Sequence, residues 1–185
     1  MKRKLEIGPE IGKRIDSSWE TLDIVPGKNI DIVADISEHL DMIKDNTYDL
    51  IYASHILEHI PWFKTVSVLK EIYRILKPKG ILEIWVPDFK KIVEVYLNKK
   101  IPDGWNMLNS EKDPYLWING RLFAYDREGT NQNIWHKATF DSIHLKSCLK
   151  KSGFIDITFL QKPRGHDHGW INLGMCGKKL SKSNL

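Results

Sequence analysis

Residues 48–59 read YDLIYASHILEH, an apolar run that passes directly into a polar segment. Its first six residues have the composition of a strand, and the turn-forming residues 45–47 precede them. In residues 66–76 the apolar side chains recur three and four positions apart, which predicts a helix with one buried face. A strand that leads into such a helix is typical of a parallel sheet.

The same alternation continues on both sides of this stretch. Short apolar runs bounded by turn residues predict strands at 4–7, 20–25, 30–36, 81–86, 155–160 and 170–177, and further helices at 89–97 and 140–152. The residues Pro78-Lys79-Gly80 are expected to end the helix before the fifth strand. We therefore predict an α/β fold with a seven-stranded, mostly parallel sheet, helices on its faces, and an antiparallel hairpin at one edge.

The chain has 185 residues, a length that predicts one domain over residues 1–185. Residues 98–135 interrupt the alternation and are rich in glycine, proline and aromatic residues. Ordered insertions of this kind often border a site, so we expect this one to form a lid or a substrate wall.

The net charge is +4, but the lysines are scattered, which favours a solvated surface over a nucleic-acid interface. No apolar run approaches the roughly 20 residues that span a bilayer, and no secretory leader pattern is present. Two cysteines are too few for a disulfide framework. We expect a cytoplasmic protein without a membrane span, and a homodimer is left open.

Polar residues and a glycine follow successive predicted strands, at the sheet edge where α/β proteins bind ligands. Gly8 allows a ligand to approach the backbone closely. Asp23 is placed to accept hydrogen bonds from ribose hydroxyls, and Asp35 from an adenine amino group, with Ile36 packed on the ring. Residues 53–55 would lie near the rest of such a ligand.

Glu10 stands where a dinucleotide-binding fingerprint has its middle glycine. An acid at this position repels a pyrophosphate. The sequence therefore argues against NAD and for a ligand without phosphates.

These segments resemble the class I S-adenosylmethionine-dependent methyltransferases, and among them the short type 11-like group. The matching segments are residues 5–9, 20–24, 33–35, 48–59, 76–80 and 86–88. The resemblance is close over residues 4–90 and loose over most of the remainder. It implies a Rossmann-like fold and S-adenosyl-L-methionine as cofactor, with S-adenosyl-L-homocysteine as product.

The resemblance also implies roles for particular residues. Glu6 and Gly8 would hold the methionine end, Asp23 the ribose, and Asp35 with Ile36 the adenine. The expected cofactor-binding residues are Glu6, Gly8, Pro9, Asp23, Ile24, Asp35, Ile36, Ala53, Ser54 and His55.

Two features depart from the usual family pattern. Glu10 replaces a glycine, and residues 12–19 are too few for a crossover helix, which needs about a dozen residues or more. The short members of the family share this abbreviated first crossover.

Methyl transfer to an oxygen often needs a general base, and His55, Asp88 and His136 are the catalytic candidates. His59 is interpreted as a structural residue. We expect no metal site, because His166 and His168 lack further ligands at suitable spacing. His136, His144 and Cys148 would meet only if the fold brought His136 to the other two.

The resulting hypothesis is an enzyme that methylates a small molecule or a sugar unit of a glycan. Aromatic residues in the 98–135 insertion fit sugar rings, although core packing explains them equally well. The alternative is a catalytically weak subunit that keeps the cofactor fold and supports a partner protein. A nucleic-acid methyltransferase is disfavoured, because residues 54–57 carry no Asn/Asp-Pro-Pro-aromatic motif.

Overall fold

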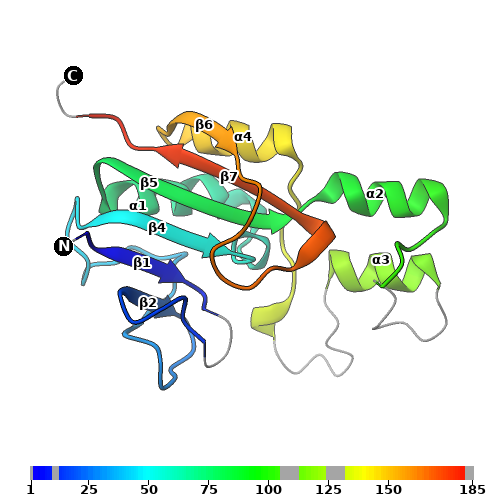
Figure 1. Cartoon of the computed structure of the whole chain (residues 1–185), viewed down its shortest axis with the longest axis horizontal. Coiled ribbons are helices and arrows are strands. Elements are labelled where there is room, and N and C mark those ends of the chain that lie inside the picture. Colours follow the sequence, from blue (N-terminus) through cyan, green and yellow to red (C-terminus); the bar gives the residue numbers. More distant parts are fainter. Residues whose placement is uncertain (1, 10–12, 105–112, 124–131, 182–185) are drawn as a thin grey trace.

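The computed structural model of the chain describes residues 2–9, 13–104, 113–123 and 132–181. Its strands are β1 (Lys4–Ile7), β2 (Trp19–Asp23), β3 (Ile32–Val33), β4 (Tyr48–Ser54), β5 (Leu76–Pro87), β6 (Ile155–Phe159) and β7 (Asn172–Lys178). They form one seven-stranded sheet in the order β3-β2-β1-β4-β5-β7-β6 (Figure 1). The pairings from β3 to β5 are parallel, and β7 runs antiparallel to both β5 and β6. The predicted sheet and its antiparallel edge are therefore confirmed.

The α-helices are α1 (Thr65–Ile75), α2 (Phe89–Asn98), α3 (Pro114–Leu122) and α4 (Ser142–Lys151). Short 3-10 turns occur at η1 (Leu57–His59), η2 (Trp62–Lys64), η3 (Gln132–Ile134) and η4 (Gly169–Ile171). Among the described residues every helix is too short or too polar to cross a membrane.

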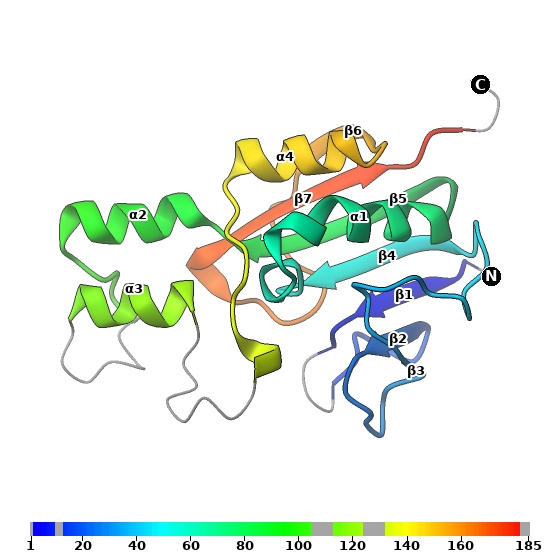
Figure 2. The ribbon, with the colours of Figure 1, turned by 180° about the vertical axis from the view of Figure 1, so that it is seen from behind.

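Helices cover one face of the sheet rather than both faces as predicted. In Figure 2, α1 and α4 lie side by side on that face, and in Figure 1 the segment between β6 and β7 crosses the opposite face. The connections from β1 to β2 and from β2 to β3 are shorter than the dozen or so residues that a crossover helix requires. The described parts of both connections accordingly contain no helix.

The strands alternate between two apolar clusters, as the two-residue period of a strand requires. Ile51 and Ile84 face α1 and α4 and are at most 1% exposed, in a cluster that includes most buried side chains of the sheet. Their neighbours Tyr52 and Trp85 join Trp19 in a small buried cluster. The face without helices thus still has an apolar core of its own.

The boundary between α1 and β5 differs from the prediction. The helix ends at Ile75, and residues 78–80 lie inside β5 instead of terminating the helix. A Cβ atom on Gly80 would come within 2.7 Å of the Lys77 carbonyl oxygen, so the glycine is needed where the backbone folds tightly at the start of the strand. Likewise, the strand predicted at 30–36 pairs only over Ile32–Val33.

Helices α2 and α3 extend beyond the sheet and pack on each other (Figure 1). Ile92, Val95 and Trp117 are buried between them, with Ile171 from η4. Asp88 and Asp113 cap the two helices by accepting hydrogen bonds from backbone amides. Part of the predicted 98–135 insertion is therefore a helix, while residues 105–112 and 124–131, like Glu10, lie outside the described residues.

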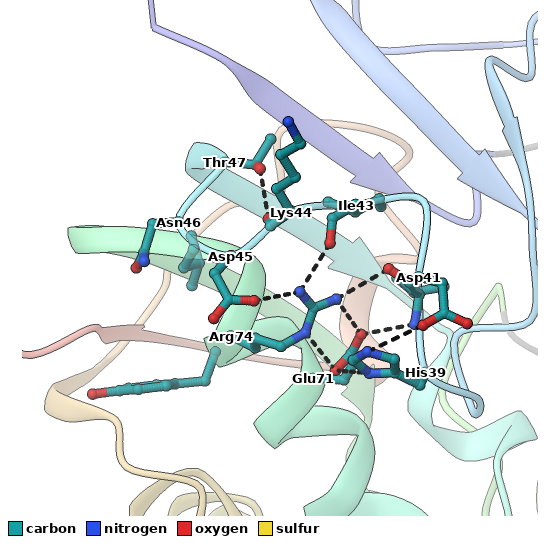
Figure 3. A network of polar contacts seen from close by, with 12 residues as sticks. His39, Asp41, Ile43, Lys44, Asp45, Asn46, Thr47, Glu71 and Arg74 are labelled. Carbon is teal, nitrogen blue, oxygen red and sulfur yellow. Dashed lines mark hydrogen bonds and ion pairs between the residues drawn. The ribbon is translucent and has the colours of Figure 1, made fainter.

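A polar network fixes the helix-free segment before β4 onto α1 (Figure 3). Arg74 binds both carboxylate oxygens of Glu71, at 2.6 and 2.9 Å, and also the Ile43 carbonyl and Asp45. Glu71 in turn accepts a hydrogen bond from the Leu40 amide at 2.8 Å. Burial opposes the ionisation of Glu71, but these hydrogen bonds outweigh it and lower its pKa to about 2.

This lowered pKa predicts a loss of stability in acid. Because the pKa of Glu71 falls from its ordinary 4.5 to about 2 on folding, its contribution is complete above pH 4.5 and disappears as the pH falls towards 2. In Glu71→Gln, the free energy of unfolding should fall at neutral pH by up to about 3 kcal/mol and depend less on pH in this window. Urea unfolding at several pH values measures both effects.

The exposed Asp41 provides the matched control, because its side chain is 91% exposed at the edge of the same network. Asp41→Asn should leave both the stability and its pH dependence nearly unchanged. A Glu71→Gln profile parallel to that of the wild type would contradict the assigned role of Glu71.

Candidate functional site

Two carboxylates lie at the carboxyl ends of adjacent strands. Asp23 ends β2 and is paired with Val33 of β3, and Asp35 follows two residues later. Asp23 Oδ1 accepts a hydrogen bond from the Val25 amide, and Asp35 Oδ1 accepts one from the Ser37 amide, both at 2.8 Å. Each carboxylate therefore keeps one oxygen for a ligand at the same edge of the sheet.

A cavity of about 470 Å³ lies at the ends of β1, the strand next to β2, and of β4. Four of the expected cofactor residues line it: Glu6 and Gly8 at the end of β1, and Ser54 and His55 at the end of β4. Its wall also includes Lys13, Arg14, Ile15, Tyr52, His59, Arg164, Gly165, His166 and His168, most of which sequence reasoning had not assigned to the site. The cavity therefore combines acidic, basic and imidazole groups.

The other six expected cofactor residues, Asp23 and Asp35 among them, are not in the described lining of this cavity. Pro9 is buried next to Gly8, and Ala53 is 3% exposed at the end of β4. Ile24 is 47% exposed beyond β2, whereas Ile36 is buried in the main apolar cluster. Of these two, Ile24 offers the larger apolar surface to a ligand.

Gly8 is required by its backbone conformation and by a close neighbour. Its φ angle is +68°, and its amide donates a 2.8 Å hydrogen bond to the Leu22 carbonyl of β2. A Cβ atom here would lie 1.9 Å from Cδ1 of Ile56. Ile56 therefore occupies the space that a side chain at position 8 would need. Gly8 also lines the cavity.

Glu6 brings a buried acid to the cavity. Its side chain is 5% exposed, and Oε2 accepts a hydrogen bond from the Ile15 amide at 2.8 Å. Burial raises the pKa of Glu6, while this hydrogen bond and the nearby Arg14 oppose the rise. Lys13 and Arg14 lie on the same wall. The site therefore has a carboxylate that can pair with an ammonium group and basic side chains that can pair with a carboxylate, as in a zwitterionic amino acid.

His55 is held between two oxygen atoms. Its Nδ1 lies 3.1 Å from Glu58 Oε1, and its Nε2 lies 2.8 Å from Asn172 Oδ1. Asn172 uses its amide nitrogen to donate to Asp167, which fixes its oxygen towards His55. The two oxygens therefore fix the orientation of the ring on the cavity wall. The ring of His168 stacks on this imidazole at 3.8 Å.

Glu58 was missed by the sequence analysis. It lies on η1, three residues after His55, and is 1% exposed. Burial opposes the ionisation of its carboxyl group, but His55 and His59 outweigh burial and hold its pKa below the usual range. The available signal was an acid flanked by histidines in residues 55–59, although nothing in the sequence indicated that it would be buried.

Asp88 and His136, the other catalytic candidates, lie outside the described lining of the cavity. Asp88 caps α2 by accepting from the Lys90 amide at 3.0 Å, and burial raises its pKa. His136 Nδ1 lies 2.8 Å from the Arg121 carbonyl oxygen, and burial lowers its pKa. The His136 ring meets the edge of the His59 ring at 5.0 Å.

The segment between β6 and β7 forms the remaining wall of the cavity. Arg164 binds both oxygens of Glu83 on β5, at 2.5 and 2.7 Å, and the Gly165 amide donates to the Tyr52 hydroxyl. These contacts hold the segment against the sheet face without helices.

Comparison with known proteins agrees with this geometry. A family model described as a methyltransferase domain matches residues 13–84. A demethylmenaquinone methyltransferase from Staphylococcus epidermidis is 26% identical over 144 residues, which cover 75% of this chain and 55% of that protein. The chain therefore spans little more than half the length of this relative.

Solved structures show the same fold. A methyltransferase from Methanosarcina mazei superposes with a TM-score of 0.60 at 16% identity, over 98% of this chain and 93% of that one. The CalH methyltransferase in complex with S-adenosylhomocysteine gives 0.56 at 20% identity, over 96% and 51%. These likenesses show a fold shared with known methyltransferases.

The environment of Gly8 leads to a stability prediction. Gly8→Ala places a Cβ atom on top of Ile56 in a backbone conformation that favours glycine, so the free energy of unfolding should fall by about 2–4 kcal/mol. Urea denaturation measures this loss. Combining the change with Ile56→Ala should recover part of it, because the double variant removes the clash and leaves the backbone strain.

Gly104→Ala is the matched control. Gly104 also has a positive φ, of +81°, but no atom lies within 4 Å of its would-be Cβ. This control should lose only the cost of backbone strain, about 1 kcal/mol. Equal losses in Gly8→Ala and Gly104→Ala would show that Ile56 does not confine Gly8.

Proposed function

We propose that this chain transfers a methyl group from S-adenosyl-L-methionine to a small-molecule acceptor. The observation that carries the proposal is the pair of carboxylates, Asp23 at the end of β2 and Asp35 just beyond β3, next to β1, whose Glu6 lines the cavity. The match to a methyltransferase-domain model and the similarity to a demethylmenaquinone methyltransferase support the same reaction class.

The donor set suits each part of the cofactor. Asp23 would accept hydrogen bonds from the ribose hydroxyls, and Asp35 from the adenine amino group. Glu6 would face the ammonium group of the methionine part, and Lys13 with Arg14 its carboxylate. When bound, the cofactor supplies a methyl group on a positively charged sulfur, so the protein mainly has to orient the acceptor.

His55 is placed to act on the acceptor rather than on the cofactor alone. The His55 imidazole on the cavity wall would contact the acceptor, and Glu58 and Asn172 would hold the ring in its orientation. Asp88 and His136 are the proposed alternatives for the general base. Burial raises the pKa of Asp88, which makes its carboxylate a better proton acceptor, whereas burial lowers the pKa of His136, which favours the neutral ring.

For the acceptor we propose a compact molecule, with residues 98–135 as one wall of its site. A sugar unit belongs to this class, but Trp117 is fully buried between α2 and α3 and would not stack on it. Tyr115, Phe123 and Trp135 are 63%, 52% and 39% exposed and are the described aromatic residues of this segment that remain for stacking.

The proposal predicts that Asp23→Asn weakens the binding of S-adenosylhomocysteine. Loss of the charged acceptor should cost about 1.5–3 kcal/mol, which corresponds to a roughly 10- to 100-fold higher Kd by titration calorimetry. Asp156→Asn, at an acid on β6 that is 68% exposed, should bind like the wild type.

Unchanged affinity in Asp23→Asn would refute the assignment of the ribose site. No binding of S-adenosylhomocysteine by the wild-type chain alone, together with binding once a partner protein is added, would favour the alternative of a supporting subunit.

A further inference from the structure

We propose that Glu58, His59 and His136 form a binding site for a divalent transition-metal ion, with Zn²⁺ as the best match. One nitrogen of each histidine and one carboxylate oxygen of Glu58 lie within 4.8 Å of one another. Glu58 and His59 come from η1, and His136 comes from the segment that precedes α4. This site lies next to the cavity, because His59 also lines the cavity wall.

The hydrogen bonds of both histidines leave a ring nitrogen able to bind a metal. His136 Nδ1 lies 2.8 Å from the Arg121 carbonyl oxygen, and His59 Nδ1 lies 3.4 Å from the Trp135 carbonyl oxygen. A carbonyl can only accept, so each Nδ1 donates its proton and each Nε2 keeps its lone pair. Metal-binding histidines generally have this arrangement, since the second bond fixes the ring and its tautomer.

The carboxylate of Glu58 points to the same conclusion independently. Its side chain is buried, and neither oxygen has a hydrogen-bond partner with normal geometry. His55 lies within ion-pair distance of one oxygen and balances part of the charge. A buried carboxylate that lacks hydrogen bonds is costly, and a cation bound on the side of His59 and His136 would remove that cost.

The backbone already holds the two segments together. The amides of Lys137 and Ala138 both donate to the Glu58 carbonyl oxygen, at 2.6 and 3.2 Å. Zinc bonds of about 2.1 Å place tetrahedral ligand atoms about 3.4 Å apart, so small side-chain rotations would complete the site. Because the two hydrogen bonds to the Glu58 carbonyl hold the backbone in place, only the side chains of the three ligands have to move.

Two histidines and one carboxylate are a ligand set that Zn²⁺ and Fe²⁺ share in proteins. Three protein ligands leave a coordination position for water or for an acceptor oxygen from the cavity. The sequence analysis expected no metal, because His166 and His168 lack further ligands at suitable spacing. His136 is far along the chain from residues 58 and 59, and only the fold brings these three together. The metal site itself does not depend on the proposed methyl transfer, and a metal on His136 Nε2 would leave Asp88 as the general base.

The test uses the full chain without an affinity tag, stripped with a chelator and then titrated with Zn²⁺ in the absence of cofactor. We expect one equivalent to bind with a Kd below about 1 μM and to raise the Tm. Co²⁺ should bind to the same site and give the visible absorption of a four-coordinate ion. His136→Ala should weaken Zn²⁺ binding by at least about 100-fold, since it removes one of three protein ligands.

His144→Ala is the matched control, because His144 lies beside Cys148 on α4 and is not among the three residues whose ligand atoms meet. It should bind Zn²⁺ like the wild type. Glu58→Gln should also lose Zn²⁺ binding, and if this buried change prevents folding, the less buried His59→Gln takes its place. Absence of stoichiometric Zn²⁺ binding by the wild type, or wild-type affinity in His136→Ala, would overturn the proposal.

Binding of S-adenosylhomocysteine is measured on the same variants. Loss of Zn²⁺ binding with retained S-adenosylhomocysteine binding separates the metal site from the cofactor site. The two measurements therefore show separately whether the metal-site proposal or the methyl-transfer proposal has failed.

Discussion

The parallel pairing of β1 between β2 and β4 is the constraint on which the site depends. Glu6 of β1 lies opposite Thr21 of β2 on one side and Tyr52 of β4 on the other. The chain runs outward to β3 in one direction and to β5 in the other, so the ends of β1 and β4 form the switch point of the sheet. The cavity lies at this point, with walls from the ends of both strands.

The sheet is covered unequally, and the cover on its second face depends on polar contacts. Where longer α/β proteins have helices, this chain uses the buried aromatic residues Trp19, Tyr52 and Trp85 with the segment between β6 and β7. The two hydrogen bonds between Arg164 and Glu83 fix that segment in place. The same contacts therefore cover the apolar cluster and close one side of the cavity.

Much of the fold could be predicted from the sequence, because periodicity records which side chains face a core. The runs around Ile51 and Ile84 and the stripe through Leu69 and Ile72 gave the strands and helix that form the main cluster. Asp23 was recognised because a strand end is a local feature. Glu6 and Gly8 were recognised at the end of β1, and the cavity lining includes both.

The rest depended on contacts between distant segments. The burial of Glu58 and its approach to His136 arise only when the segment before α4 folds over η1. The single-sided cover of helices follows from two short connections, and only the first was recognised as too short. The end of α1 at Ile75 could not be located either, because the tight backbone around Gly80 permits β5 to begin before the proline.

Helices α2 and α3 have a consequence for motion. Among the residues that the structure describes, their shared apolar cluster is separate from the one under the sheet. A unit with its own small core opens at a lower free energy than the sheet that carries it. This pair of helices can therefore loosen as a group while the strand ends keep their geometry, which gives the acceptor molecule a route of entry and exit.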